Sequence, residues 1–310
     1  MIINGKDIAQ KIYHSLSEKV EKLLRQSITP HLSIILIGND PASESYVFMK
    51  KKRGEELGCI VDIIIYPDSV TQRELINRIK ELNRAPNING IIVQRPVPGH
   101  IDQEEVDKAV VPEKDVDGFA PDSQFVEPIA LAVEEILKDI FVKEEKIGGE
   151  GQGSTPSSKS PISRNISEYA GVNEFIKKEY PIWLSTKKIA VIGKGKTGGT
   201  PIIKYFRSLD VDPTIIDSKT SNPDEITKNA DIIVTTVGKK EVIKPENIKK
   251  GAILIAIGMH KGEDGKLHAD YEEEEIENIA GFYTSVPGGV GPVNVAMLLS
   301  NLVIATENHS

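Results

Sequence analysis

Short apolar runs alternate with amphipathic segments through the first 140 residues of the chain. The apolar runs have the length and the β-branched content of buried strands. The amphipathic segments carry apolar residues three and four positions apart, as one face of a helix does. The runs expected as strands are 32–37, 60–66 and 88–93, and the segments expected as helices are 7–26, 71–82 and 128–142. Asp40 followed by Pro41 predicts a further helix start, with Asp40 as the cap.

The same alternation resumes near residue 188. The runs expected as strands here are 188–192, 213–216, 231–237 and 252–257. An apolar run over 295–304, spaced as on a helix, predicts a C-terminal helix. Strands that alternate with helices indicate parallel sheets covered on both faces, so the chain predicts an α/β fold with two α/β units. In such sheets ligands bind beyond the carboxyl ends of the strands.

Between these two units the composition changes. Residues 148–163 are rich in glycine and serine and almost free of apolar side chains. Such a segment cannot bury enough apolar surface to offset the entropy of ordering it. We therefore expect 144–166 to be a mobile surface insertion, followed by a short helix over 172–180.

Charge and cysteine content narrow the class of protein. The 38 basic and 46 acidic side chains give a formal charge of −8, which argues against nonspecific nucleic-acid binding. The single cysteine, Cys59, excludes an internal disulfide and a cysteine-based metal cage, and suits a reducing cytoplasm. The first residues lack the pattern of a signal peptide, and no uninterrupted apolar run approaches the roughly 20 residues of a membrane span. We expect a cytoplasmic protein without a metal, a nucleic acid or a membrane as partner.

A glycine-rich turn follows the first strand of the second unit directly. Gly193, Gly195 and Gly198 form a G-x-G-x-x-G motif between a strand and a helix, the context that dinucleotide binding requires. The glycines make the turn tight and let a pyrophosphate reach the helix N-terminus. Asp217 ends the next strand, nineteen residues beyond Gly198, where an acidic residue binds the ribose hydroxyls. A merely tight strand–helix turn is the alternative.

The residues around Asp217 give opposing signals about the cofactor. Asp217 favours NAD, since a carboxylate accepts from the ribose 2′-hydroxyl and repels a 2′-phosphate. Lys194, Ser218 and Lys219 favour NADP, because two cations and a hydroxyl can surround that phosphate.

Tyr46 and Lys50 are the first candidates for chemistry in the first unit. They lie four residues apart and so share one face of a helix. A phenol beside an amine can orient it, and a partly desolvated lysine can titrate near neutrality and act as base or acid. On spacing alone, a solvated basic face over residues 51–53 with Tyr46 at its edge is the more common arrangement.

Three further features can hold a ligand. Gln94 follows the third strand and places an amide at its carboxyl end. Asp117 precedes a glycine and can accept two hydrogen bonds from an aminopyrimidine-like edge, with a plain Asp-Gly turn as the alternative. Residues 286–292 contain three glycines and two prolines before the C-terminal helix. They predict either a rigid loop that holds a flat or anionic ligand, or a tight turn only.

Four motifs occur in order along the chain. They are Tyr46-x-x-x-Lys50, the Gln94 segment over 93–98, the Asp117 segment over 112–118, and the glycine loop over 286–292. In this register the chain resembles the bifunctional methylenetetrahydrofolate dehydrogenase/methenyltetrahydrofolate cyclohydrolase family, over nearly its whole length apart from 144–166. The resemblance implies a catalytic, folate-binding domain of residues 1–140 and 284–310 and a Rossmann domain of residues 141–283. It also implies a homodimer, and a C-terminal helix that packs back on the first domain.

The resemblance also implies roles for single residues. Lys50 would be the central catalytic residue, with Tyr46 stacking on the folate, Gln94 bonding Lys50 or the reacting centre, and Asp117 anchoring the pterin. The residues implied to line the folate cleft are Pro287, Gly288 and Gly291. The residues expected to meet the dinucleotide are Gly193, Lys194, Gly195, Gly198, Asp217, Ser218 and Lys219. The family favours NADP, and Asp217 leaves NAD possible.

Two reactions on tetrahydrofolate derivatives are implied. Hydride passes from 5,10-methylenetetrahydrofolate to the nicotinamide, and water then opens the methenyl product to 10-formyltetrahydrofolate. The alternatives are a dehydrogenase of the same family with weak cyclohydrolase, and a catalytically silent folate- or nucleotide-binding homologue. Retention of Tyr46, Lys50, Gln94 and Asp117 argues against a silent homologue, because a silent binder has no need of the lysine.

Several positions depart from the family pattern and bear on the balance of the two activities. Arg95 stands in place of leucine and puts a charge next to the folate site. The other departures are Ile129 in place of threonine, Gly198 in place of valine, Ala256 within the expected Ile-Asp-Val-Gly strand end, and Ser285 and Asn294 in place of proline and threonine.

Overall fold

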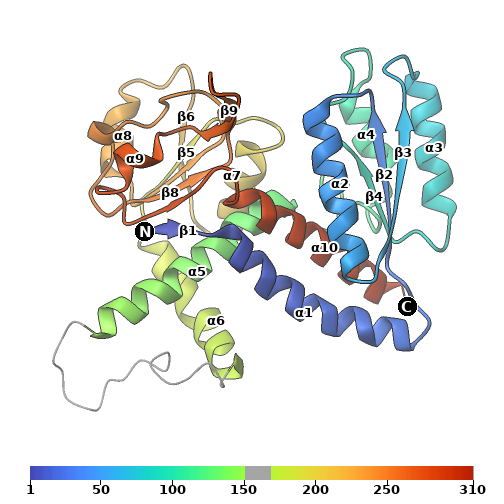
Figure 1. Ribbon diagram of the computed structural model, residues 1–310, viewed down its shortest axis with the longest axis horizontal. Coiled ribbons are helices and arrows are strands. Elements are labelled where there is room, and N and C mark those ends of the chain that lie inside the picture. The colour runs from blue at the N-terminus through green and yellow to red at the C-terminus, as the bar shows by residue number, and fades with distance from the viewer. Residues whose placement is uncertain (151–168, 310) are drawn as a thin grey trace. The chain divides into compact units, whose positions relative to one another are not determined.

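The computed structural model describes residues 1–150 and 169–309, and the chain divides into two compact units (Figure 1). Unit 1 comprises residues 1–8 and 132–293, and unit 2 comprises residues 9–131 and 294–310. The divisions fall inside three helices, α1 (Gly5–Arg25), α5 (Pro128–Glu150) and α10 (Val290–Asn308). The first eight residues thus belong to unit 1, whereas the sequence assigned them to the first domain.

Unit 2 is built on a three-stranded parallel sheet in the order β3-β2-β4. Its strands are β2 (His31–Ile37), β3 (Ile60–Tyr66) and β4 (Gly90–Val93), and its own helices are α2 (Pro41–Glu56), α3 (Gln72–Arg84) and α4 (Gln103–Ala109). The predicted parallel sheet is confirmed, and only the short helix α4 was not expected.

Alternate residues of the fully buried strand β2 enter two different cores. Leu32, Ile34 and Leu36 pack with α1, α2 and the later part of α10, whereas Ile35 and Ile37 pack with α3 and α4. Burial on both faces explains why this strand reads as a continuous apolar run rather than as an alternation. The expectation that the C-terminal helix packs on the first-half sheet is confirmed for the part of α10 that lies in unit 2.

Local capping fixes where the helices of unit 2 begin. The Asp40 carboxylate accepts from the Ser43 N–H at 2.8 Å, and Pro41 occupies the first turn of α2, as predicted. Thr71 and Glu74 form a reciprocal capping box at the start of α3.

Helix α10 is long and apolar enough to cross a membrane by length and composition alone, with a mean hydropathy of 1.3. Sixty-one per cent of that window is buried inside the protein. Its residues Val295, Leu298, Leu299 and Leu302 belong to the core of unit 2, which accounts for their apolar character.

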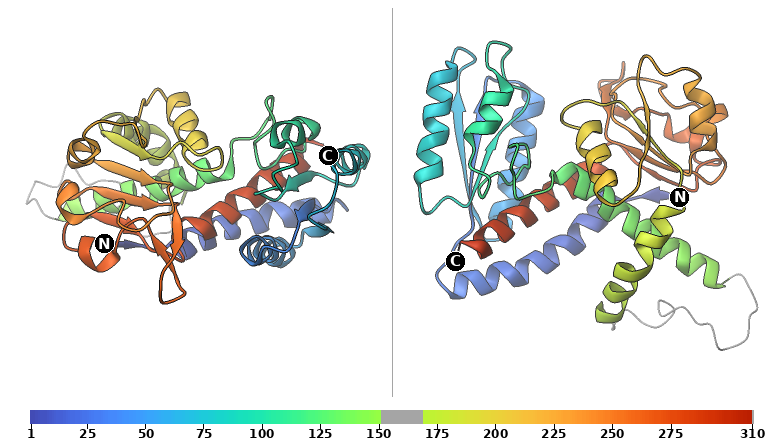
Figure 2. Two further views of the ribbon diagram at one scale, coloured as in Figure 1. Left: turned by 90° about the horizontal axis from the view of Figure 1, so that it is seen from above. Right: turned by 180° about the vertical axis from the view of Figure 1, so that it is seen from behind.

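Unit 1 contains a six-stranded parallel sheet in the order β1-β11-β8-β7-β5-β6 (Figure 2). The strands are β1 (Ile2–Ile3), β11 (Phe282–Thr284), β8 (Ile253–Ala256), β7 (Ile232–Thr235), β5 (Ile189–Ile192) and β6 (Thr214–Ile216). A hairpin of β9 (Met259–Lys261) and β10 (Leu267–Ala269) accompanies it, and the helices are α6 (Tyr169–Ser185), α7 (Gly199–Ser208), α8 (Pro223–Asn229) and α9 (Glu273–Ile276), with a 3₁₀ turn at Pro245–Asn247.

Helix α5 extends further than the sequence predicted. It continues to Glu150, whereas the predicted helix ends at residue 142. The Trp183 indole N–H donates to the Glu144 carboxylate at 2.9 Å, which fixes α5 against α6. Phe141 stacks on Phe175 with ring centroids 5.6 Å apart across the same two helices. The rest of the expected insertion lies outside the residues that the structure describes.

Candidate active site

The amine of Lys50 is buried in unit 2, and a fixed amide holds it. Lys50 is 4% exposed, and its Nζ atom donates to Gln94 Oε1 at 3.0 Å. The backbone N–H of Gln94 donates to the Ile35 carbonyl at 2.8 Å, which continues the sheet one residue beyond β4. The Gln94 Nε2 atom donates to the Arg95 carbonyl at 2.8 Å, so the amide presents its oxygen to Lys50.

Tyr46 lies beside Lys50, because α2 carries both on one face. The Lys50 Nζ atom is 4.8 Å from the centre of the Tyr46 ring, within the range of a cation–π contact. The Asn294 side-chain amide of α10 donates to the Tyr46 hydroxyl. Burial raises the pKa of Tyr46, so the phenol stays neutral. Asn294 is 248 residues away from Tyr46, so no local sequence pattern indicates this contact.

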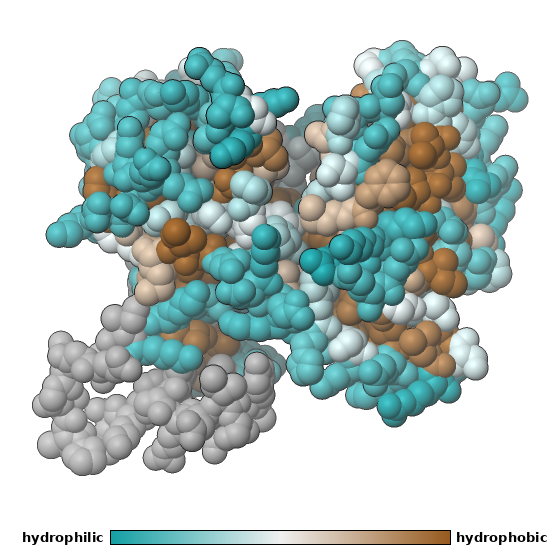
Figure 3. Space-filling view, viewed as in Figure 1, coloured by the Kyte–Doolittle hydropathy of each residue, from teal (hydrophilic) through white to brown (hydrophobic). Residues whose placement is uncertain are grey.

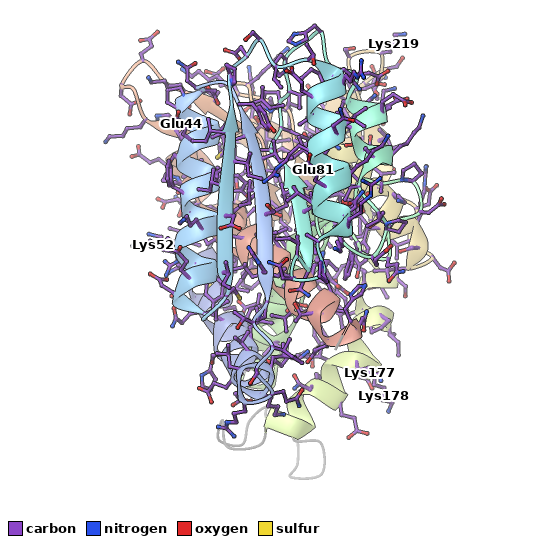
Figure 4. All side chains as sticks on the ribbon, turned by 90° about the vertical axis from the view of Figure 1, so that its right-hand side faces the viewer. Glu44, Lys52, Glu81, Lys177, Lys178 and Lys219 are labelled. Carbon is purple, nitrogen blue, oxygen red and sulfur yellow. The ribbon has the colours of Figure 1, made fainter. Side chains whose placement is uncertain are left out.

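Burial lowers the pKa of Lys50 from its ordinary value, and the nearby Asp117 carboxylate opposes this shift. A lysine whose pKa is lowered can release and accept a proton closer to neutrality. The solvated basic face that was the alternative exists beside it on the same helix. Lys51 and Lys52 form ion pairs with Glu55 and Glu56, and Lys52 lies on the outer side of α2 (Figure 4). Lys50 is therefore distinct from the basic residues that follow it.

Asp117 lines a pocket at the carboxyl end of β4. The pocket is lined by Ile91, Ile92, Val93, Arg95, Val106, Asp107, Val110, Asp115, Asp117 and Phe119. Gly118 has a positive φ of 79°, and a Cβ there would lie 2.8 Å from the Glu127 backbone nitrogen. The Asp-Gly turn is thus real, and it leaves the half-buried Asp117 at the pocket wall.

The two residues before this turn have structural partners. The buried Asp115 carboxylate accepts from the Ala120 N–H at 2.7 Å, and burial raises the pKa of Asp115 to about 6. The Lys114 ammonium donates to the Asn83 and Ala85 carbonyls at 2.9 and 2.8 Å, at the C-terminus of α3. These side chains hold the segment, while Asp117 remains available to a ligand.

The charge of Arg95 is compensated. Its Nη2 atom lies 2.6 Å from Asp107 Oδ1, and its guanidinium lies 3.6 Å from the centre of the Phe119 ring. The side chain is 13% exposed. The departure from leucine therefore adds a paired cation to the pocket wall.

In unit 1 the glycine motif forms the turn between β5 and α7. Gly193 has a φ of 92°, and a Cβ on Gly199 would lie 2.0 Å from the Gly193 carbonyl oxygen. A Cβ on Gly195 would meet nothing within 4 Å. Gly198 caps α7, so the glycine that lets helix and strand approach is Gly199 rather than Gly198.

Asp217 and Lys194, which gave opposing signals about the cofactor, pair with each other. The Lys194 Nζ atom lies 2.6 Å from Asp217 Oδ2, and the Lys219 N–H donates to Asp217 Oδ1 at 2.9 Å. These contacts, the Lys194 hydrogen bond first, hold the pKa of Asp217 at about 2. Ser218 and Lys219 are exposed beside this pair, and Lys219 is labelled in Figure 4.

The glycine loop is shorter than expected. Helix α10 begins at Val290, so Gly291 and Pro292 belong to its first turn. Gly288 has a φ of 107°, and a Cβ on Gly5 would lie 1.7 Å from the Gly289 carbonyl oxygen. Pro287, Gly288 and Gly291 belong to unit 1, whereas Lys50, Tyr46, Gln94 and Asp117 belong to unit 2.

Within residues 1–150 and 169–309, no group of three or more acidic, histidine or cysteine side chains is placed to hold a metal ion.

Two family models match the chain. Tetrahydrofolate dehydrogenase/cyclohydrolase, catalytic domain, matches residues 3–117, and the NAD(P)-binding domain of the same family matches residues 168–310. The Bifunctional protein FolD of Ligilactobacillus salivarius is 37% identical over 306 residues, which cover 99% of this chain and 96% of that protein. That of Lactococcus lactis subsp. lactis is 36% identical and covers 99% and 97%.

Solved structures agree with these matches. The bifunctional enzyme FolD, methylenetetrahydrofolate dehydrogenase/cyclohydrolase, from Campylobacter jejuni superposes with a TM-score of 0.83 at 28% identity, covering 100% of this chain and 99% of that one. The Trypanosoma brucei N5,N10-methylenetetrahydrofolate dehydrogenase-cyclohydrolase, complexed with NADP cofactor and inhibitor, superposes with a TM-score of 0.82 at 27% identity, covering 99% and 97%.

Proposed function

The chain belongs to the tetrahydrofolate dehydrogenase/cyclohydrolase family, and from this we propose two consecutive reactions on one-carbon derivatives of tetrahydrofolate. The first oxidises 5,10-methylenetetrahydrofolate to 5,10-methenyltetrahydrofolate with NADP. The second hydrolyses that product to 10-formyltetrahydrofolate. The observation that carries the proposal is the buried Lys50 amine, bonded to Gln94 and lying against Tyr46.

Lys50 is the acid–base group of the hydrolysis. Addition of water to the methenyl carbon requires that the water lose a proton, and opening of the ring requires that a nitrogen gain one. Because burial lowers the pKa of Lys50, its neutral form is accessible as the acceptor of the first proton. The resulting ammonium is stabilised by the Gln94 oxygen and can return the proton.

The remaining folate contacts follow from the residue types. The Tyr46 ring offers a flat surface to an aromatic ring. Asp117 at the pocket wall accepts two hydrogen bonds from the aminopyrimidine edge of the pterin. Folate binding by Pro287, Gly288 and Gly291 remains a proposal from the family resemblance.

The turn in unit 1 fits a dinucleotide. Gly195 leaves open space above the turn, and Gly199 brings the N-terminus of α7 close to β5. When bound, the nicotinamide accepts the hydride of the first reaction. The residues that would hold the cofactor are Gly193, Lys194, Gly195, Gly198, Asp217, Ser218 and Lys219.

We propose NADP as the preferred cofactor. Lys194 offsets the charge of Asp217, so the carboxylate repels a 2′-phosphate less than a lone carboxylate would. Ser218 and Lys219 are exposed beside it and can contact that phosphate. The Trypanosoma brucei relative carries NADP. Asp217 also leaves NAD usable.

A homodimer is the proposed assembly. Among the strands that the structure describes, β3 pairs with β2 alone, so its other edge has no described strand beside it. Ile60 and Ile65 on this strand are 46% and 61% exposed, and apolar side chains gather over β3 in Figure 3. A second copy of the chain would cover this surface. Sedimentation velocity tests the assembly, and a monomer at micromolar concentration would contradict it.

The cellular setting follows from charge and from the cysteine. We place the enzyme in the cytoplasm, since Cys59 is unpaired and buried. The net charge of −8 supports the absence of a nucleic-acid partner.

An absorbance assay for methenyltetrahydrofolate tests the two activities together. The enzyme should form this compound from methylenetetrahydrofolate, faster with NADP than with NAD, and should accelerate its decay. Formation without accelerated decay would mark a dehydrogenase with weak cyclohydrolase. Neither formation nor decay would mark a silent homologue.

A further inference from the structure

Only one of the two polar atoms of the Asn294 side chain has a described hydrogen-bond partner. Its Nδ2 atom donates to the Tyr46 hydroxyl, whereas its Oδ1 atom is buried and accepts no hydrogen bond from any residue that the structure describes. A buried acceptor without a partner costs stability, and a leucine of similar size would avoid that cost. The hydrogen bond to Tyr46 is therefore the contact that an asparagine supplies and a leucine does not.

This hydrogen bond holds the far end of the Tyr46 ring. Helix α2 already fixes the near end of the side chain, so the two attachments together set the position of the ring. Val47 of α2 packs in one core with Val295 and Leu298 of α10, so the two helices that carry the partners are themselves held together. The Lys50 ammonium lies 4.8 Å from the centre of the ring thus held. A cation–π contact depends on this placement of the cation over the ring face.

We propose that Asn294 is a positioning residue for the hydrolysis: it holds the Tyr46 hydroxyl and so keeps the phenol ring against the Lys50 ammonium. This role rests on the proposed function, in which Lys50 transfers the proton. Gln94, the residue after β4, accepts a hydrogen bond from the same ammonium, and Asp117 acts on it as the nearby carboxylate. The titratable groups that act on Tyr46 are Asp117 and Tyr13 of α1, and Arg53 lies over the Tyr13 ring.

The pH profile of the hydrolysis tests this role with Asn294→Leu. The hydrolysis rate rises with pH as Lys50 becomes neutral, so the acidic limb of the profile reports the pKa of Lys50. A ring that no longer lies over the ammonium stabilises the charged form less, which lowers this pKa. We expect the limb to move to lower pH by about half a unit to one unit, from the usual strength of a cation–π contact. An unmoved limb would overturn the proposal.

Asn294→Asp is the conservative partner of this variant. The Tyr46 hydroxyl can donate to the new carboxyl group, so the ring stays held. We expect the limb to remain at its wild-type pH or to move above it, because a negative charge favours the ammonium. A shift to lower pH, as in Asn294→Leu, would contradict a role through this hydrogen bond. If Asn294→Leu fails to fold, the pH profile of Asn294→Asp still tests the proposal. The double-mutant cycle can then be measured with Asn294→Ala instead of Asn294→Leu.

A double-mutant cycle separates action through Tyr46 from direct action. Tyr46→Phe keeps the ring but removes the hydroxyl that Asn294 holds. At a pH above the acidic limb, where Lys50 is neutral in every variant, Asn294→Leu should change the hydrolysis rate of Tyr46→Phe less than about twofold. In the wild type it should lower that rate by about three- to tenfold, the factor for one hydrogen bond. An equal loss in both backgrounds would overturn the proposal.

Asn301→Leu is the matched control. Asn301 lies on the same helix and donates to the backbone carbonyls of Val116 and Val126 at 2.9 and 3.0 Å. Its loss should lower the melting temperature and leave the acidic limb in place. If the wild type hydrolyses the substrate and Asn294→Leu has the same pH profile, the positioning role alone is disproved. If the wild type shows no hydrolysis, the proposed function is disproved.

Discussion

The Lys50 Nζ atom and the Gln94 Oε1 atom lie 3.0 Å apart, and this hydrogen bond joins helix α2 to the end of strand β4. It gives a buried ammonium a fixed acceptor, which an amide can provide without adding a charge. A carboxylate in the same place would raise the pKa of Lys50 and oppose the effect of its burial. The neutral amide therefore keeps the lysine in a range where it can exchange protons.

Replacing Lys50 by methionine should abolish the hydrolysis while leaving folate binding measurable. Methionine fills similar volume but carries no titratable group, and loss of a positioned acid–base group costs a factor of about 100 to 10,000. The decay of methenyltetrahydrofolate absorbance measures the loss. Lys51→Met is the control, because Lys51 pairs with Glu55 at 3.4 Å on the solvated side of α2. Hydrolysis by Lys50→Met at the wild-type rate would disprove the assignment.

Asp117→Ala should weaken folate binding by roughly 1.5–3 kcal/mol, the range for hydrogen bonds to a charged group. The affinity for the dinucleotide should hardly change, because its motif belongs to unit 1. Titration calorimetry with each ligand measures both effects. Asp122→Ala is the control, because Asp122 is an exposed aspartate shortly after the 112–118 segment. Equal weakening of both ligands would indicate a folding defect instead of a lost contact.

The sequence predicted most of the fold because strands β2, β4, β5, β7 and β8 are fully buried and therefore read as apolar runs. Strand β3 has the predicted bounds, and Asp40 caps α2 as its position before Pro41 indicated. The strands β1 and β11 were not predicted, since two or three residues are too few to show a period. Their place in the sheet is set by pairing with residues far away in the chain.

The candidate site was predictable in its residue types and less so in its contacts. The spacing of Tyr46 and Lys50 predicted a shared helix face, but spacing cannot distinguish a buried lysine from a solvated one. The contact between Asn294 and Tyr46 depends on packing between helices that are remote in sequence. The role of Gly199 depends on a distance of 2.0 Å to a carbonyl, which a glycine pattern does not contain.

The free energy of unfolding should depend on pH through the titration of Asp115. Burial raises the pKa of this carboxyl from 3.8 to about 6, and the side chain is 4% exposed. Between pH 3.8 and 6 the Asp115 carboxyl is therefore protonated in the folded state and ionised in the unfolded state. Its contribution to the free energy of unfolding is full below pH 3.8 and is lost as the pH rises through 6. The difference of two units corresponds to roughly 3 kcal/mol.

Asp115→Asn should remove this part of the pH dependence, since the amide oxygen can still accept from the Ala120 N–H. Urea unfolding at pH 4 and pH 7 measures it. The wild type should lose roughly 2–3 kcal/mol more than the variant between the two values. Asp122→Asn, which changes an exposed carboxylate, should behave as the wild type does. Parallel curves for Asp115→Asn and the wild type would show that Asp115 is not the group responsible.

The pair of Lys194 and Asp217 should set the choice between NADP and NAD. Lys194→Ala removes a cation that can meet the 2′-phosphate and also leaves Asp217 without the partner 2.6 Å away. Both changes oppose a phosphate, so the Michaelis constant should rise more for NADP than for NAD. Asp217→Ser removes the carboxylate that accepts from the ribose 2′-hydroxyl, so it should weaken NAD and sharpen the preference for NADP. Initial rates of methenyltetrahydrofolate formation with each cofactor measure both effects. The proposal would be contradicted if the wild type used NAD far better than NADP and Lys194→Ala weakened both cofactors equally. Asp217 alone would then determine cofactor choice, and the proposed preference for NADP would be wrong.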